Sequence, residues 1–305
     1  MLLRLSLPTP ARFETARQLD VQIGGAEANV AAVVARLGLR VAWISALPAN
    51  EWGARVRREL VGHGIDCSAV PAIESSRMGL YFLEYGVPPR PIRVLYDRRD
   101  SAFTRLRTED VNWQLVRHAR IVHLSGITPA LGALPRQLVE RAVTEAAELS
   151  FDVNYRATLW SPAEARAFAE SVLPRVRYLF IGMEEARTVF ELGGAPDEVL
   201  DVLARRAPKA IIALMQGAEG CTVREGGRLL RPRRRHQVEV VDPIGAGDAF
   251  VGGFLWALLS GRTLEDAIEA AQAVAALKCS TWGDIALVTS RDVDDVLSGG
   301  PSVRR

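Results

Sequence analysis

The chain has 305 residues, of which 49% are hydrophobic and 24% are charged, and its formal net charge is only +2. A chain with this apolar content and so little self-repulsion collapses, which excludes a disordered protein. The near-balanced, mixed charges also argue against a nucleic-acid partner. One basic run, residues 231–236, lacks interleaved aromatic residues, so we interpret it as a solvated strand face.

The sequence favours a soluble protein of a reducing cytoplasm. No apolar run reaches the roughly 18 residues of a membrane helix, since two glycines interrupt the longest candidate, residues 249–259. The first ten residues lack the charged leader and cleavage site of a signal peptide. Cys67, Cys221 and Cys279 form no CxxC pair and are odd in number, which argues against a disulfide framework or a zinc site.

Strand-like and helical patterns alternate along most of the chain. This rhythm is typical of repeated βα units and a mostly parallel sheet. The first clear helix, residues 26–37, is rich in alanine and ends at Gly38. Further helices are predicted at residues 51–62, 135–148, 162–173 and 196–206. Strands are predicted at residues 40–47, 121–124, 149–153, 178–181 and 211–215.

One region breaks the rhythm. Residues 77–85 and 91–98 are rich in Tyr, Leu, Ile and Val and are joined by the turn-forming sequence GVPPR, which predicts a β-hairpin. We therefore expect a small β-sheet lid, built from roughly residues 1–10, 17–24 and 75–100, on a larger α/β body. Of the two arrangements that the length allows, two domains or one with an appendage, the pattern favours the second.

Residues 240–261, VVDPIGAGDAFVGGFLWALLSG, carry the most chemical information. A β-type run at residues 238–242 ends in a glycine-containing turn, and an apolar helix begins there. Gly245 and Gly247 allow close approach of a ligand to the backbone, and the free N–H groups of a helix start bind anions. An aspartate such as Asp248 commonly caps a helix. Beside an anion pocket, however, a carboxylate suits a base that deprotonates a hydroxyl during phosphoryl transfer.

The chain resembles the ribokinase-like (PfkB) carbohydrate kinases. The resemblance rests on GAGD preceded by Asp242, and on GGAEANVA at residues 24–31. Four further segments narrow it to the 2-keto-3-deoxygluconate kinase branch: GLYFLEYG at 79–86, RVLYDRRDSAF at 93–103, FDVNYRATLW at 151–160 and ALKCSTWGDIALVT at 276–289. It implies a three-layer α/β/α sandwich with a mostly parallel central sheet and a small β-sheet lid, as a single domain over residues 1–305.

The resemblance also implies an activity. It implies an enzyme that uses ATP and Mg²⁺, with a monovalent cation as a further candidate, to phosphorylate the terminal hydroxyl of 2-keto-3-deoxygluconate. A fructokinase or another sugar kinase is the nearest alternative. A catalytically weakened sugar-binding regulatory protein is an alternative of another class, because Met183, Ala186 and Met215 stand where the family usually has residues tied to magnesium, phosphate or nucleotide. The intact GAGD argues against that alternative.

Residue roles follow from the same resemblance. Asp248 is the expected general base, and the amides of Gly245, Ala246 and Gly247 form the expected anion hole. The expected substrate-binding residues are Gly25, Ala26, Glu27, Asn29, Tyr81, Tyr96, Arg98, Arg156, Asp248 and Asp284. The expected ATP-binding residues are Asn154, Arg156, Met215, Gly217, Gly220, Gly245, Ala246, Gly247 and Gln272, and the expected metal-binding residues are Glu185 and Asp242.

Arg98 and Arg156 are the residues expected to recognise the carboxylate of a sugar acid, because guanidinium groups bind that anion bidentately. A surface ion pair is the alternative for the arginines. Simple strand packing is the alternative for Tyr81 and Tyr96. Two further departures from the family pattern, Gln272 for Asn and Pro243 for Thr, concern the nucleotide side.

Two expectations concern the N-terminus and assembly. Relatives carry a full strand before the segment that resembles MLLRLSLP, so we expect a central strand to be shortened or missing and the natural start to lie upstream. An intact mass matching residues 1–305 would contradict this. A small lid sheet with two apolar faces needs cover, so a homodimer through the lid is expected.

Overall fold

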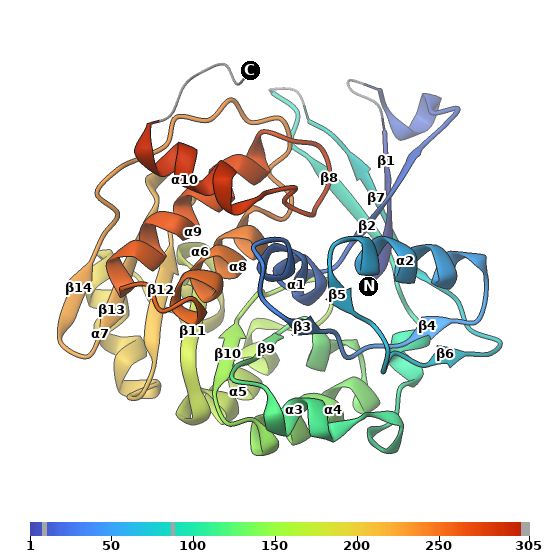
Figure 1. Cartoon of the computed structure of the whole chain (residues 1–305), viewed down its shortest axis with the longest axis horizontal. Coiled ribbons are helices and arrows are strands. Elements are labelled where there is room, and N and C mark those ends of the chain that lie inside the picture. The colour runs from blue at the N-terminus through green and yellow to red at the C-terminus, as the bar shows by residue number, and fades with distance from the viewer. Residues whose placement is uncertain (8–10, 87–88, 300–305) are drawn as a thin grey trace.

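A six-stranded central sheet forms the middle of the molecule (Figure 1). The computed structural model describes residues 1–7, 11–86 and 89–299. The strand order is β14-β13-β12-β11-β10-β9, with β9 to β12 parallel and β13 and β14 antiparallel. The strands are β9 (Val122–Ser125), β10 (Leu149–Asp152), β11 (Val176–Gly182), β12 (Ile211–Met215), β13 (Cys221–Glu225) and β14 (Arg228–Leu230). The mostly parallel sheet is confirmed.

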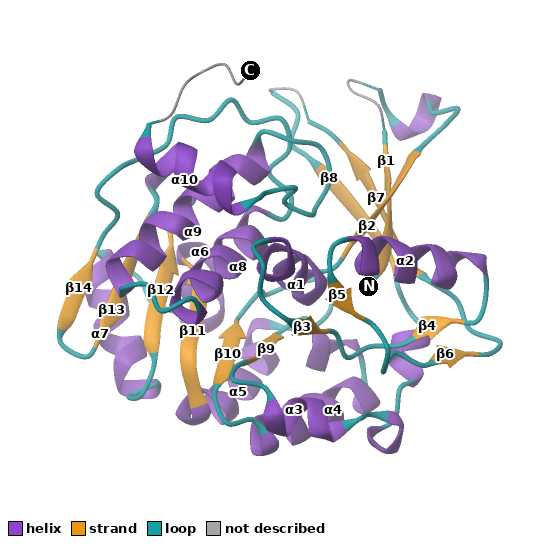
Figure 2. Ribbon diagram, in the orientation of Figure 1, coloured by secondary structure: helices purple, strands orange, loops and turns teal. Residues whose placement is uncertain are grey.

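Helices cover both faces of this sheet (Figure 2). Successive strand residues point to opposite faces, so Leu179 and Ile181 pack into one core and Phe180 into the other. The first core contains α3 (Trp113–His118), α4 (Ala133–Glu145), α5 (Pro162–Val172), α6 (Met183–Phe190) and α7 (Pro196–Arg206). The second contains α1 (Ala26–Arg36), α8 (Ala246–Leu259), α9 (Leu264–Cys279) and α10 (Ser290–Ser298). The three-layer α/β/α sandwich is confirmed.

A separate four-stranded sheet lies to one side of the sandwich, near α1 and α2 at the upper right of Figure 1. Its order is β2-β1-β7-β8, from β1 (Leu2–Ser6), β2 (Asp20–Gly24), β7 (Gly79–Glu84) and β8 (Arg93–Asp97). β7 and β8 form the predicted antiparallel hairpin, and Tyr81, Leu83 and Tyr85 make a small core of their own. The small β-sheet lid is confirmed. Its predicted residues 8–10, and residues 87–88 of the turn, lie outside the described residues.

The remaining elements are short, apart from α2 (Glu51–Gly62), whose first amides are capped by Asn50. They are β3 (Val41–Ala42), β4 (Leu47–Pro48), β5 (Ile65–Asp66) and β6 (Ala72–Ile73). The 3₁₀ helices are Phe13–Thr15, Ala102–Arg105, Thr108–Asp110, Thr128–Leu131, Leu173–Arg175 and Gly217–Glu219.

The predicted strand at residues 40–47 is wrong in extent. Only two short pieces form ladders there, β3 with β5 and β4 with β6. The other edge of β3 faces a cavity that residues 119–124, at the free edge of β9, also line. Among the described residues no strand joins these two edges. The upstream start of the natural chain stays a prediction.

Two further predictions in the C-terminal half are also wrong. Residues 238–242 form no strand, because the N–H groups of Val241 and Asp242 donate to the Cys279 carbonyl oxygen at the end of α9 instead of to a neighbouring strand. The basic run at 231–236 follows β14 as irregular chain, not as a strand face. Arg231 and Arg235 form ion pairs with Asp197 and Glu219 of other segments, whereas the Arg234 side chain donates to the Leu297 carbonyl oxygen.

The three cysteines are free thiols, and Cys67 and Cys221 are buried. No helix within the described ranges combines the length and the apolar character that crossing a bilayer requires. The cytoplasmic location and the single-domain organisation stay predictions.

Candidate active site

The start of α8 builds a turn that only glycine can make. Gly245 has a φ of +86°, and a Cβ atom there would lie 2.1 Å from the carbonyl oxygen of Asp284. The missing side chain therefore allows both the left-handed backbone and the close contact. The Ala246 amide donates to the Pro243 carbonyl oxygen at 3.2 Å, whereas Gly245 and Gly247 line the cavity in front of the helix. A helix start that opens into a cavity is suited to an anion.

Asp248 lies in the first turn of α8 with only 9% of its surface exposed. Its carboxylate accepts a hydrogen bond from the Asn29 amide at 2.7 Å, and Asn154 Nδ2 lies 3.5 Å from its other oxygen. Burial raises the pKa of Asp248 to about 7, although the Asn29 hydrogen bond and the nearby Arg156 oppose the rise. A carboxylate with a pKa near the working pH is suited to general base catalysis.

Asp152 and Glu185 are two of the carboxylates that line the cavity with Asp248. Burial, Glu185 and Asp248 raise the pKa of Asp152 well above its usual range. Burial also raises the pKa of Glu185, against hydrogen bonds from the backbone N–H groups of Gly182 and Tyr155 at 2.8 and 2.7 Å. Carboxylates that repel one another in this way are stabilised by a bound cation.

This donor set fits Mg²⁺ together with phosphate oxygens, because Mg²⁺ is usually held by one or two carboxylates plus the phosphates of a substrate. The described residues contain no cluster of three or more His, Cys, Asp or Glu residues that could hold a metal without such help.

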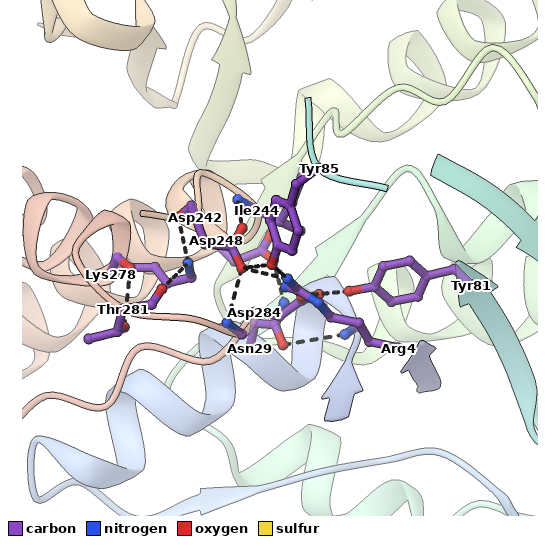
Figure 3. A network of polar contacts seen from close by, with 12 residues as sticks. Arg4, Asn29, Tyr81, Tyr85, Asp242, Ile244, Asp248, Lys278, Thr281 and Asp284 are labelled. Carbon is purple, nitrogen blue, oxygen red and sulfur yellow. Dashed lines mark hydrogen bonds and ion pairs between the residues drawn. The ribbon is translucent and has the colours of Figure 1, made fainter. Parts of the chain in front are cut away.

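A buried charge network lies beside the anion pocket (Figure 3). Arg4 is fully buried and donates to Asp242 Oδ2 and to Asp284 Oδ1, each at 2.6 Å. The Tyr81 hydroxyl donates to Asp284 at 2.5 Å, and the Tyr85 hydroxyl donates to Asp242 at 2.8 Å. Protein donors thus occupy the Asp242 carboxylate, so its predicted metal-binding role receives no support from this geometry and stays a prediction.

The residues expected to bind the sugar line one part of the same cavity, which extends on between β3 and β9 and has a total volume of about 1440 Å³. Gly25, Ala26 and Asn29 lie at the start of α1, and the Gly25 N–H donates to Asn29 Oδ1 at 3.3 Å. The neighbouring Glu27 carboxylate accepts hydrogen bonds from the hydroxyls of Ser125 and Thr128 at 2.7 and 2.6 Å. This side of the cavity therefore presents fixed polar groups, as binding of a polyhydroxy compound requires.

Arg98 lines this cavity, and no carboxylate of the described residues pairs with its charge. The residue is 8% exposed and its guanidinium lies 4.0 Å over the ring of Tyr96; its Nε and Nη2 atoms are buried and have no hydrogen-bond partner within the described part of the chain. Burial lowers the pKa of Arg98, and the nearby Arg156 lowers it further. Buried donors of a charged group left unpaired are costly. The arrangement is therefore suited to a bound anion that pairs with both arginines.

The nucleotide-side residues divide into two groups. Asn154, in a left-handed conformation with φ of +40°, lines the cavity with Arg156 and Met215. Gly217 and Gly220 lie in the turn after β12, and Gln272 lies on α9. None of these three residues lines the cavity. A Cβ atom on Gly220 would lie 3.2 Å from Gln272 Nε2, so this turn packs against the middle of α9.

Sequence reasoning missed Arg4, Tyr85, Asp152 and Lys278. Arg4 had a readable signal, since it is the only charged residue in the apolar strand segment LLRLS. Asp152 lies within FDVNYRATLW, where the aspartate ends a buried strand. Lys278 was detectable only by composition, because the chain contains just two lysines.

Comparison with known proteins agrees with these observations. Residues 4–291 match the family described as pfkB family carbohydrate kinase. The chain is 39% identical to a 2-dehydro-3-deoxygalactonokinase of Haloferax volcanii, over 98% of this chain and 95% of the relative. It is 30% identical to a 2-dehydro-3-deoxygluconokinase of Thermoproteus tenax, over 97% of this chain and 91% of the relative.

A solved structure gives the same result. The crystal structure of 2-dehydro-3-deoxygluconokinase from Thermotoga maritima superposes with a TM-score of 0.92 at 30% identity, covering 98% of this chain and 96% of that chain. Sequence and fold therefore match over almost the whole length. The chain belongs to the pfkB family of carbohydrate kinases and is a sugar phosphotransferase.

Proposed function

We propose that this kinase phosphorylates the terminal hydroxyl of 2-keto-3-deoxygluconate, also written 2-dehydro-3-deoxygluconate. Membership in the family implies ATP as the phosphoryl donor. The observation that carries the substrate class is the buried, unpaired guanidinium of Arg98 beside Arg156, because it needs an anion that a neutral sugar does not supply. Two of the similar proteins reported above are named for a 2-dehydro-3-deoxygluconate substrate.

A second candidate substrate is the galactonate epimer. The Haloferax volcanii relative, 39% identical, is named for 2-dehydro-3-deoxygalactonate. Both compounds carry the same keto-acid end, so Arg98 can pair equally well with the carboxylate of either. A panel that contains both epimers, fructose and a neutral 2-keto sugar tests the assignment.

In the proposed mechanism Asp248 removes the proton of the substrate hydroxyl. The Asn29 amide, bonded at 2.7 Å, fixes the orientation of the carboxylate that receives this proton. The amides at the start of α8 bind the negative charge that develops on the transferring phosphoryl group. Mg²⁺, when bound, would be held by Asp152 and Glu185 together with phosphate oxygens and would supply charge neutralisation.

The structure bears on the alternative of a weakened regulatory protein. Ala186 is fully buried in the core beneath α6, and Met183 packs partly buried against the same core. Of the three unusual residues, Met215 lines the cavity. Met183 and Ala186 therefore pack into this core, while the carboxylates of Asp152 and Glu185 supply charge at the cavity.

We expect kcat/KM to rise with pH and to level off above about pH 7. The base works only when deprotonated, and burial raises the pKa of Asp248 to about 7. Below that value the rate falls about tenfold per pH unit, as for one titrating group. A pH profile of kcat/KM from pH 5 to 9 checks this. A rate that stays flat down to pH 5 would contradict it.

Arg98→Ala is expected to slow phosphorylation of the keto-acid selectively. The variant should lower kcat/KM for 2-keto-3-deoxygluconate by about 10- to 100-fold, the size of a lost charge-assisted hydrogen bond, and leave a neutral 2-keto sugar nearly unchanged. Arg99→Ala, an exposed neighbour, is the matched control. Equal losses for acid and neutral sugar would show that Arg98 does not recognise the carboxylate.

A homodimer through the lid stays part of the proposal. Leu95 and Tyr96 on β8 are 48% and 36% exposed, so the lid presents apolar surface that a second subunit could cover.

A further inference from the structure

Lys278 is a buried ammonium that the mechanism above does not use. It lies in the last turn of α9 and has no exposed surface. Its Nζ atom donates to the carbonyl oxygen of Asp242 at 2.8 Å and lies 3.4 Å from the carbonyl oxygen of Thr281 (Figure 3). A buried ammonium is costly unless such acceptors surround it. Burial accordingly lowers the pKa of Lys278.

The choice of lysine at this position is unusual for this chain. Only two of its 38 basic Lys and Arg residues are lysines, and the other, Lys209, is exposed. Arginine carries a planar fork that suits carboxylates, whereas lysine carries a compact point charge with three donors. A site lined by carbonyl oxygens suits the compact cation. The position therefore favours the compact ammonium of lysine over the planar guanidinium of arginine.

The Lys278 ammonium holds the segment that leads into the anion pocket. Asp242 precedes the turn at residues 243–245, and Arg4 holds its carboxylate. The N–H groups of Val241 and Asp242 are bound by the Cys279 carbonyl oxygen at 2.8 and 3.2 Å. Lys278 binds the Asp242 carbonyl oxygen from the same end of α9. Because residues 238–242 have no sheet ladder, these contacts position the turn.

We propose that Lys278 is a tethered cation. Its ammonium occupies the place that a free monovalent cation would take between the carbonyl oxygens of Asp242 and Thr281. It thereby positions the anion-binding turn and makes phosphoryl transfer independent of added K⁺ or NH₄⁺. The catalytic part rests on the proposed role of the α8 start as the anion hole. A bland alternative is that Lys278 only complements the C-terminal dipole of α9.

The test compares wild type, Lys278→Ala and the exposed control Lys209→Ala in choline, Na⁺, K⁺ and NH₄⁺ chlorides at equal ionic strength. Wild type and Lys209→Ala should show the same kcat in all four salts. Lys278→Ala should lose about tenfold or more in kcat in choline, the size of a lost charge-assisted hydrogen bond. K⁺ or NH₄⁺ should restore part of that kcat, with a smaller effect on KM.

A second readout does not need activity. The thermal midpoint of Lys278→Ala should rise with K⁺ or NH₄⁺ relative to choline, because an ion that binds the folded state stabilises it. The wild-type midpoint should not discriminate among the salts. Wild type without turnover on any sugar would overturn the proposed function, while this readout would still decide the role of Lys278.

Three outcomes would overturn the proposal. The first is a wild type that K⁺ or NH₄⁺ activates. The second is a Lys278→Ala variant that is destabilised but keeps full kcat, as the dipole alternative predicts. The third is a loss of kcat or of thermal stability that no cation restores. If Lys278→Ala does not fold, the kcat of wild type in the four salts still shows whether phosphoryl transfer is independent of K⁺ and NH₄⁺.

Discussion

Asp248→Asn should lower kcat by at least about 100-fold and leave KM for the sugar acid nearly unchanged, since loss of a general base commonly costs 10²- to 10⁴-fold. The substitution keeps the size of the side chain and its contact with Asn29, which holds the carboxylate at 2.7 Å. What it removes is the ability to accept the proton of the hydroxyl. Steady-state kinetics with ATP saturating measure both parameters.

Asp294→Asn is the matched control for this prediction. Asp294 is exposed on α10, and its contact with Arg262 is a long one of 3.6 Å, so the control removes a charge without touching the cavity. It should keep normal kinetics. Normal turnover in Asp248→Asn would remove this residue from the role of base, whatever the behaviour of the control.

Arg4→Met should destabilise the fold by about 3–5 kcal/mol, because removing one partner of a buried ion pair leaves its charges uncompensated. Here two carboxylates, Asp242 and Asp284, each lose a donor at 2.6 Å in the interior of the protein. The loss should appear as a lower midpoint of urea unfolding without a change in slope.

The exposed pair Arg77–Asp97 offers the control. Its side chains are 40% and 54% exposed, so Arg77→Met should cost no more than about 1 kcal/mol. Where Arg4→Met does not fold, the double variant Arg4→Met/Asp242→Asn removes both charges of one pair and should recover part of the stability. An Arg4→Met variant as stable as Arg77→Met would contradict the stabilising role of the network.

Local sequence patterns predicted those elements whose signals lie within the element itself. The structure has α2, α7 and β12 at residues 51–62, 196–206 and 211–215, the bounds predicted from periodicity and from the helix-start prolines and caps. Residues 238–242 have equally strong β-type character but form no strand, because the N–H groups of Val241 and Asp242 donate to the Cys279 carbonyl oxygen at the end of α9. Strand formation depends on a partner that a local pattern does not contain.

The candidate site divides in the same way. Asp248 and the glycines around it were predicted because they share one short motif, and Arg98 was predicted through its lid segment. The contacts of Arg4 and Lys278 with Asp242 span 238 and 36 residues of sequence. Their roles depend on where the fold brings distant segments together. Burial and hydrogen-bond partners, which only the structure provides, reveal them.

The most direct measurement is an ATP-dependent phosphorylation assay of the purified protein, with and without Mg²⁺. Its substrates are 2-keto-3-deoxygluconate, its galactonate epimer, fructose and a neutral 2-keto sugar. We predict Mg²⁺-dependent formation of ADP and of a sugar-acid phosphate with 2-keto-3-deoxygluconate, and little turnover of the neutral sugars. Phosphorylation of fructose with no turnover of either keto-acid, or binding of the keto-acid without phosphate transfer, would contradict the proposed function.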